Sequence, residues 1–286
     1  PDCDIWLKYA GQQKVHQAII SYLSVKKNNF YAVENTVDGK FFVTARGWED
    51  LSEILKSYEE LQVEIGEELI GEFLQKEEIA RDFAGYYRLY EKYKSDYQIQ
   101  EILDGNVTSG QLKTCCDMGK KASFEERFTV TEMLLEAVTE RISSFQKTDE
   151  KTEKLYGNLK LLKVFLQEKN SVEAMEQFIV SRRKALDAKI CSELLTAEEA
   201  AREEEQIRIL EEYFFQLKEL HISDVAEGIE QIGERFGNVC RLRNEKLEET
   251  KKMLEQAFSF LEECFGEGQE LLLFETGLTG DDRCSI

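Results

Sequence analysis

The stretch that decides the fold of this chain is Phe41-Phe42-Val43-Thr44-Ala45-Arg46-Gly47-Trp48-Glu49-Asp50-Leu51. Its aromatic and β-branched start predicts a short strand, and Thr44 is a residue type that caps helices, so the strand is expected to run directly into a helix. Arg46 then falls in the first helical turn. Because a helix amino end already carries about half a positive charge, acidic residues are favoured there and an arginine is not. A guanidinium beside free backbone N–H groups suits an anion such as phosphate, which makes Arg46 the first candidate for a functional site.

Upstream of this stretch the sequence predicts a β-hairpin that follows a first helix. An aspartate near the N-terminus can cap that helix, whose apolar positions continue to about Val25. The apolar runs Phe30–Val33 and Phe41–Val43 then flank Asp38-Gly39, a pair that favours the positive φ angles of a tight turn. We therefore expect a hairpin at about 30–43.

Downstream, a short helix is expected over about 67–75 and a longer one over about 77–97. The longer helix carries aromatic residues at helical spacing, which favours core packing over a stacking surface for bases. Residues 104–123 lose this periodicity and gather Gly, Ser, Thr and Asn. We interpret residues 1–103 as one domain and residues 104–123 as a linker.

From residue 124 to residue 286 the sequence is a series of long amphipathic helices. Apolar residues recur every three or four positions, and the last helix is expected to extend for roughly 40 residues, about 60 Å. Stripes of this kind pack in an antiparallel bundle. The only proline is Pro1, so no proline interrupts these helices. The predicted fold class is mainly α: a small helical domain with one β-hairpin, followed by an antiparallel bundle of long helices.

The composition argues against several classes of partner. The formal net charge is −20 and the pI is about 4.7, which disfavours nucleic acid and an anionic membrane surface. No apolar run approaches the roughly 20 residues that cross a membrane, and no signal peptide is visible. The seven cysteines are an odd number without Cys-x-x-Cys spacing. We therefore interpret them, Cys115 and Cys116 included, as ordinary reduced thiols of a cytoplasmic protein.

Catalytic and metal-binding patterns are also missing from the sequence. A di-metal helical bundle uses Glu three positions before each histidine, but Gln13 precedes His16 and Lys218 precedes His221 at that spacing. The chain contains no Gly-x-x-x-x-Gly-Lys-Ser/Thr loop, and two histidines support no nucleophile–base arrangement. We expect no metal site and no tightly bound nucleotide in this chain alone.

Arg46 has a second interpretation that involves no ligand. It stands three residues before Glu49 and four before Asp50, so it can form an exposed ion pair along the helix. Such a pair contributes only a few tenths of a kcal/mol. The local pattern by itself favours this ion pair over a phosphate contact.

Several of these segments together resemble the helical lid of AAA+ ATPases of the bacterial MoxR-like group. The resemblance rests on Asp4–Ala10, the hairpin, Val43–Leu51, and the run from Glu78–Ala84 through Lys94–Tyr97, and it extends to about residue 100. In one branch of the group a long helical extension follows the lid. Residues 124–286 resemble that extension more loosely, with Phe265–Glu270 as the most similar piece.

The resemblance implies a specific role for the first candidate residue. In these ATPases the lid closes over a nucleotide held by a preceding α/β domain, and an arginine at the start of a lid helix reaches the γ-phosphate. Arg46 stands at that position, with Gly47 beside it in the nucleotide-binding site. The intact parent protein would hold ATP with Mg²⁺ through a phosphate-binding loop, metal-binding acids and an arginine finger that lie outside this sequence. The start at Pro1, without an initiator methionine, suggests a piece cut just after that domain.

We therefore expect the C-terminal nucleotide-sensing lid and helical interaction region of a MoxR-like AAA+ ATPase. Its partners would be its own N-terminal α/β domain, further copies in a ring, and client proteins that ATP hydrolysis remodels in a chaperone-like way. The piece itself is not expected to be catalytic. The alternative is a free-standing acidic helical scaffold for protein–protein interaction, in which Arg46 is only structural.

Overall fold

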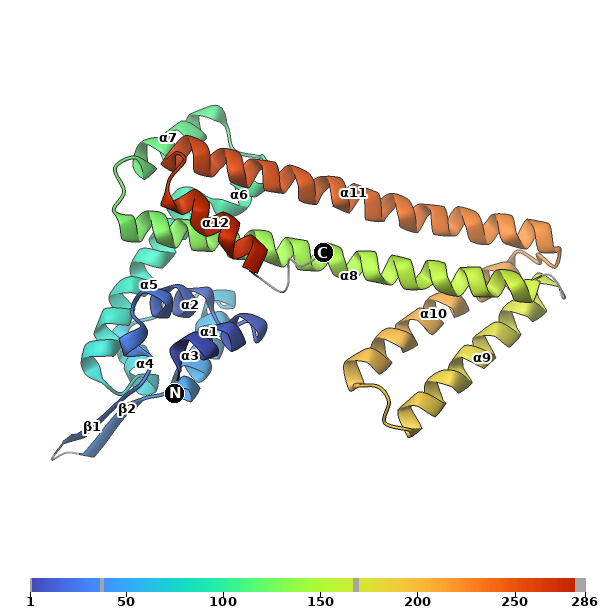
Figure 1. Ribbon diagram of the computed structural model, residues 1–286, viewed down its shortest axis with the longest axis horizontal. Coiled ribbons are helices and arrows are strands. Elements are labelled where there is room, and N and C mark those ends of the chain that lie inside the picture. The colour runs from blue at the N-terminus through green and yellow to red at the C-terminus, as the bar shows by residue number, and fades with distance from the viewer. Residues whose placement is uncertain (1, 37–38, 167–169, 281–286) are drawn as a thin grey trace. The chain divides into compact units, whose positions relative to one another are not determined.

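The computed structural model describes residues 2–36, 39–166 and 170–280 (Figure 1). The chain is mainly α-helical with a two-stranded antiparallel hairpin, which confirms the predicted fold class. It divides into two compact units. Unit 1 comprises residues 1–140 and 253–286, and unit 2 comprises residues 141–252. These units do not coincide with the predicted domains 1–103 and 124–286.

The elements follow one another along the chain with short connections. The first part of unit 1 contains α1 (Cys3–Gln12), α2 (Gln17–Val25), the 3₁₀ turn η1 (Lys27–Asn29), β1 (Ala32–Thr36), β2 (Gly39–Val43), α3 (Ala45–Glu60), α4 (Glu67–Phe73), α5 (Glu77–Tyr97), α6 (Ile99–Asp104) and α7 (Ser109–Gly119). The division between the units falls within α8 (Phe124–Leu166) and within α11 (Val225–Phe265). Unit 2 also contains α9 (Ser171–Cys191) and α10 (Ala197–Glu219), and α12 (Gln269–Gly280) returns to unit 1.

The predicted first helix is two helices in the structure. Lys14 adopts a left-handed φ of 55°, which ends α1, and the ring of His16 accepts the N–H of Ala18 at 3.2 Å to start α2. A lysine at positive φ has no sequence signal, because this conformation favours Gly and Asn. The apolar pattern also continues across the break, since Val15 is buried.

The hairpin lies where the sequence predicts it. Ala32 pairs with Val43 at the base of the ladder, and Gly39 adopts a φ of 141°, in the region that favours glycine. Asp38, the other predicted turn residue, lies outside the described residues. Val43 is fully buried and passes directly into Thr44, the cap of α3.

The core of unit 1 is built around Trp48 on α3, which is fully buried. Its ring contacts Phe83 edge-on at 5.2 Å and lies 5.8 Å from Tyr22. The aromatic residues of α5 supply much of the remaining core, as the helical spacing predicts; Phe83, Tyr87, Tyr90 and Tyr97 are all buried. Core packing is therefore the role of these rings.

The predicted linker at 104–123 contains a helix. Thr108 caps α7 in a reciprocal arrangement: its hydroxyl accepts the N–H of Gln111, whose side chain accepts the N–H of Thr108. The buried residues of α7 are Cys115, Cys116 and Gly119. With so few apolar positions the helix leaves no periodic pattern, so the sequence did not predict it.

Within unit 1, α12 packs against the first turns of α8 and the end of α11. The Arg127 guanidinium on α8 lies 3.1 Å from the buried Glu270 carboxylate, and the ring of Phe274 contacts Phe258 edge-on at 5.3 Å. These contacts place the last described helix on the same unit as the hairpin and α1–α7.

Unit 2 is a helical bundle with an aliphatic core. Its α9 and α10 run antiparallel and side by side (Figure 1). Ser171 begins α9, and its hydroxyl donates to the carbonyl of Ile222 at 2.8 Å. This bond joins the start of α9 to the connection between α10 and α11. The core consists of residues from α8, α9, α10 and α11, among them Leu155, Leu162, Met175, Phe178, Leu186, Ile207, Leu210, Leu217 and Ile232.

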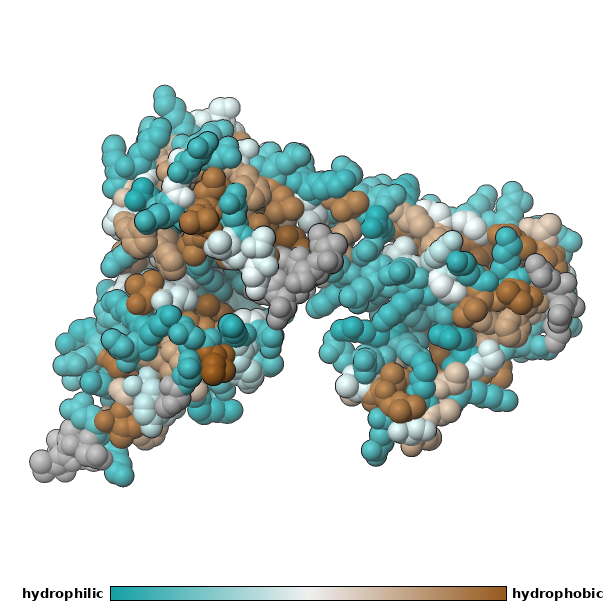
Figure 2. Space-filling model, in the orientation of Figure 1, coloured by the Kyte–Doolittle hydropathy of each residue, from teal (hydrophilic) through white to brown (hydrophobic). Residues whose placement is uncertain are grey.

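Hydrophilic residues cover most of the face drawn in Figure 2, in keeping with a chain of which 33% is charged. Among the helices of the described ranges, none combines the length and the apolar character that crossing a membrane requires.

Candidate functional site

The candidate site is the amino end of α3, where the hairpin ends. Thr44 has extended backbone angles, and its hydroxyl accepts the N–H of Gly47 at 3.2 Å, which confirms its predicted role as cap. The first N–H groups of a helix have no acceptor within the helix. Among the described residues those of Ala45 and Arg46 also have none outside it. They add positive potential at the position of Arg46.

Arg46 lies in this first turn, which contains no acidic residue. Its guanidinium forms two contacts with Asp50 one turn later: Nη2 to Oδ1 at 3.0 Å and Nε to Oδ2 at 3.1 Å. The Arg46 side chain is 79% exposed. The structure thus contains the ion pair that the sequence left open as the alternative to a phosphate contact.

Gly47 has a packing role. A Cβ atom at this position would lie 2.8 Å from the carbonyl oxygen of Phe73, closer than real Cβ contacts allow. The absence of a side chain therefore lets the start of α3 approach the end of α4. The N–H of Gly47 is bonded to Thr44, so its predicted place in a cofactor-binding site stays a prediction.

Two tryptophans fix the orientation of α3. The indole N–H of the buried Trp48 donates to the carbonyl of Phe30 at 3.1 Å, and that of Trp6 on α1 donates to Glu49 Oε1, also at 3.1 Å. Buried donors with a single acceptor restrict a helix to one rotation about its axis. The amino end of α3 is therefore held in one orientation, and the Arg46 side chain projects from it with 79% of its surface exposed.

The hairpin that leads into α3 presents apolar side chains to solvent. Val33 and Phe42 pair across the two strands and are 52% and 42% exposed. Tyr31 and Phe41 are also exposed. In Figure 1 the hairpin extends away from the helices of unit 1, next to the start of α3.

A buried polar network behind α3 was not foreseen from the sequence. His16 is 7% exposed, and its Nε2 lies 2.9 Å from Glu59 Oε1 at the end of α3. Since Nδ1 accepts the N–H of Ala18, the ring proton resides on Nε2 and is donated to the carboxylate. Tyr87 donates to the same oxygen at 3.1 Å, and Lys94 lies 3.4 Å from the other.

These partners set the charge state of Glu59. Burial by itself would raise the pKa of the carboxyl group, but the hydrogen bond from His16, the charge of Lys94 and the hydrogen bond from Tyr87 outweigh burial and lower its pKa. Glu59 therefore remains a carboxylate at neutral pH and ties α3 to α2 and α5. His16 and Glu59 are 43 residues apart, so no local pattern could have joined them.

A second network lies beside a groove that α2, α5 and the start of α8 line. Asp82 accepts the hydroxyl of Tyr22 at 2.7 Å and the ammonium of Lys26 at 2.7 and 2.8 Å. The charge of the Asp82 carboxylate is thus matched within the network. The adjoining groove has a volume of about 610 Å³ and is lined by residues such as Val25, Arg81 and Leu89.

The cysteines differ from their predicted state. Cys116 on α7 and Cys264 on α11 form a disulfide, so the interpretation of all seven as reduced thiols was wrong. Cys3, Cys115, Cys191 and Cys240 are free. The two paired residues are separated by 148 positions, and sequence spacing gives no sign of such a pair. Across the described ranges, no three His, Cys, Asp or Glu side chains gather as metal ligands would.

Comparison of the chain with models of protein families, with curated proteins and with solved structures found no match. The likeness to the lid of MoxR-like ATPases therefore rests on the sequence segments quoted for it.

Proposed function

We propose that this chain is the nucleotide-sensing lid and helical interaction region of a MoxR-like AAA+ ATPase, in which Arg46 contacts the γ-phosphate of ATP. The observation that carries the proposal is the placement of Arg46. An exposed guanidinium stands in the acid-free first turn of a helix that two tryptophans hold in place.

The ion pair with Asp50 is compatible with this role. It is exposed, so exchanging it for solvent or for another anion costs a few tenths of a kcal/mol. A planar guanidinium can then contact two phosphate oxygens and stabilise negative charge that develops there. Asp50 would hold Arg46 in position until the lid closes.

The remaining groups of the reaction belong to the parent protein in this proposal. ATP with Mg²⁺ would be bound by a preceding α/β domain, and copies of the parent would assemble into a ring in the cytoplasm. Binding and release of the γ-phosphate would move the lid. Unit 2 would engage the client protein, with exposed apolar residues such as Leu194 and Phe215, which are 73% and 60% exposed.

One observation favours the second candidate function, an acidic helical scaffold without nucleotide chemistry. The Arg46–Asp50 pair is the arrangement expected of a helix surface with no ligand. In a scaffold, removing either partner has the same small effect on stability and no other consequence.

Substitution of the two partners in the full-length parent protein distinguishes the candidates. We expect Arg46→Ala to lower the rate of ATP hydrolysis about tenfold or more, because stabilisation of phosphate charge is lost. Asp50→Ala removes the same ion pair but keeps the guanidinium, so turnover should stay close to that of the wild type. Arg241→Ala is a matched control, since Arg241 and Glu245 form an exposed pair with the same orientation and spacing.

Equal turnover in Arg46→Ala and Arg241→Ala would remove Arg46 from the site and favour the scaffold. A gene whose coding sequence before Pro1 lacks a phosphate-binding loop would contradict the ATPase proposal as a whole. The chain by itself should show no ATP hydrolysis and weak or absent binding of ATP by calorimetry. Submicromolar binding would mean that a nucleotide site exists within these residues.

A further inference from the structure

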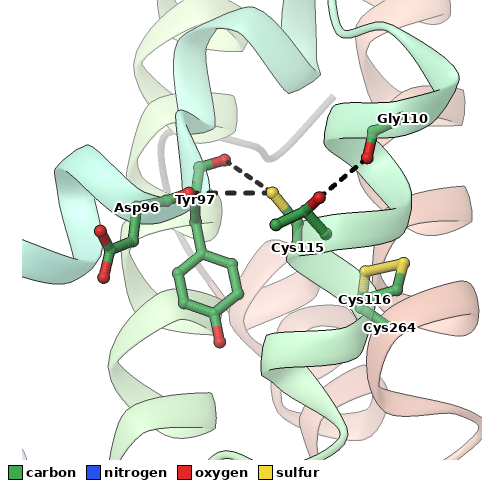
Figure 3. Close-up of a disulfide and its surroundings, with 7 residues drawn as sticks. Asp96, Tyr97, Gly110, Cys115, Cys116 and Cys264 are labelled. Atoms are coloured by element: carbon green, nitrogen blue, oxygen red, sulfur yellow. Dashed lines mark hydrogen bonds between the residues drawn. A yellow bond between two sulfur atoms is a disulfide. The ribbon is translucent and has the colours of Figure 1, made fainter.

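The disulfide joins α7 to the end of α11 within unit 1 (Figure 3). The side chain of Cys116 points toward Cys264, whereas that of its neighbour Cys115 points toward the backbone of Asp96 and Tyr97 at the end of α5. Successive residues of a helix face different directions, so these two cysteines attach α7 to two different helices. One attachment is covalent and the other is not.

The noncovalent attachment of α7 is weak. Its buried residues are Cys115, Cys116 and Gly119, all of them small, and its larger apolar residues Leu112 and Met118 are only partly buried. Hydrophobic stabilisation is proportional to the apolar area removed from water, so small side chains contribute little. The thiol of Cys115 lies 3.8 and 4.0 Å from its two carbonyl acceptors, and S–H groups are weak donors.

Alone, α7 would not remain a stable helix. It has 11 residues, and isolated helices shorter than about 12 residues are marginal in water. Gly119 of α7 lies against the ring of Phe265 at the end of α11. This contact exists only while the two helices are adjacent. The bond between Cys116 and Cys264 secures that proximity.

The aromatic packing and the polar network in the core of unit 1 form without α7. The rings of Trp48, Tyr22 and Phe83 pack against one another on α2, α3 and α5, and the His16–Glu59 network joins the same helices. These contacts involve no residue of α7. Loss of the disulfide should therefore loosen α7 locally and leave the core folded.

We propose that Cys116–Cys264 is a reversible redox site that controls the docking of α7, with a dithiol as its co-reactant. Cys116 and Cys264 are 7% and 2% exposed, so the dithiol reaches them when α7 opens locally. A thiolate of the dithiol then attacks one sulfur of the protein disulfide, and the second dithiol sulfur resolves the mixed disulfide. Two electrons and two protons pass to the protein, which gains two thiols, while the dithiol becomes a cyclic disulfide. Reduced α7 leaves the end of α11, and oxidation restores its attachment.

Cys115 does not interfere with this exchange. It is buried, and burial raises the pKa of its thiol, so little thiolate is present to attack the neighbouring disulfide. The oxidised pairing is therefore limited to Cys116 and Cys264.

Limited trypsin digestion of the whole chain tests the proposal, because Lys113 lies on the exposed side of α7. The protein is equilibrated with oxidised glutathione or with dithiothreitol, and cleavage after each lysine is followed by mass spectrometry. We expect cleavage at Lys113 to become about tenfold faster on reduction, since local opening is then easier. Lys92, an exposed lysine within α5, is the internal control and should be cut at the same rate in both states.

Two variants separate the disulfide from other effects of the reagents. Cys264→Ser should be cut rapidly at Lys113 without reductant, and Cys240→Ser, which removes a free cysteine on the same helix, should behave as the wild type. Unchanged cleavage at Lys113 on reduction would overturn the proposal. Faster cleavage at both Lys113 and Lys92 would also overturn it, because the bond would then hold unit 1 as a whole. The proposal would also be overturned if mass spectrometry of the glutathione-treated protein found no peptide linked through Cys116 and Cys264.

Discussion

Units 1 and 2 are both helical, but their cores are held together in different ways. In unit 1 the buried rings carry polar atoms with partners on other elements: Trp48 donates to Phe30, Tyr22 to Asp82 and Tyr87 to Glu59. The core of unit 2 is mainly aliphatic. Its buried tyrosine, Tyr213, has a hydroxyl without a hydrogen-bond partner among the described residues.

This difference determines how precisely the helices of each unit are oriented. A buried hydrogen bond has one favourable direction, so the elements of unit 1 are fixed in rotation as well as in distance. Aliphatic side chains fill space and tolerate rearrangement if their total volume is kept. Unit 1, with its directional core contacts, is the unit that presents Arg46, and three tests probe the difference between the units.

The largest expected effect is that of Trp48→Ala. The substitution removes a fully buried ring and leaves the carbonyl of Phe30 without its donor, so we expect a loss of about 4 to 5 kcal/mol in the free energy of unfolding. Leu210→Ala in unit 2 creates a cavity only and should cost about 2 to 4 kcal/mol. Urea denaturation followed by circular dichroism measures both. A smaller loss for Trp48→Ala than for Leu210→Ala would contradict the contrast.

A pH dependence comes next, from two glutamates of unit 1 with opposite environments. Burial and the charge of Glu136 raise the pKa of Glu132 to about 7 from 4.5. A carboxyl with a raised pKa stabilises the fold below its unfolded pKa, and this contribution is lost as the pH rises through 7. Unit 1 should thus lose on the order of 1 to 3 kcal/mol between pH 5 and pH 8.

Both tryptophans of the chain, Trp6 and Trp48, lie in unit 1, so their fluorescence during urea unfolding reports this unit. The loss of stability between pH 5 and pH 8 should be smaller in Glu132→Gln, and what remains is expected from Glu91, whose pKa burial also raises. Glu59 has the opposite sign: its pKa is lowered, so its contribution is present above about pH 4.5 and is lost as the pH falls. If the full loss of stability between pH 5 and pH 8 persists in Glu132→Gln, the loss arises from another titrating group.

The smallest effect is expected from a pair of tyrosine substitutions. Tyr87→Phe in unit 1 removes the donor to Glu59 and should destabilise by about 1 kcal/mol. Tyr213→Phe in unit 2 removes an unpaired buried hydroxyl and should be neutral or stabilise by up to about 1 kcal/mol. Thermal unfolding of the two variants gives the signs. Destabilisation by Tyr213→Phe would reveal a partner of its hydroxyl and weaken the contrast.

Local sequence patterns were sufficient to predict several elements of the fold. The hairpin, the Thr44 cap, α5 and the long α11 follow from turn residues, capping residues and apolar periodicity. The Arg46–Asp50 pair was one of two interpretations open at that position. The phosphate contact of Arg46 stays a prediction.

Other features depend on contacts that local patterns do not record. The break at Lys14 uses a conformation that lysine seldom adopts, and α7 has too few apolar positions to be periodic. The His16–Glu59 bond and the Cys116–Cys264 disulfide join residues that only the folded chain brings together.

The disulfide has a topological consequence for the whole chain. It makes residues 116–264 a covalent ring, and this ring contains every residue of unit 2. A single cut within unit 2 therefore opens the ring without separating the chain into two molecules, until a reductant is added.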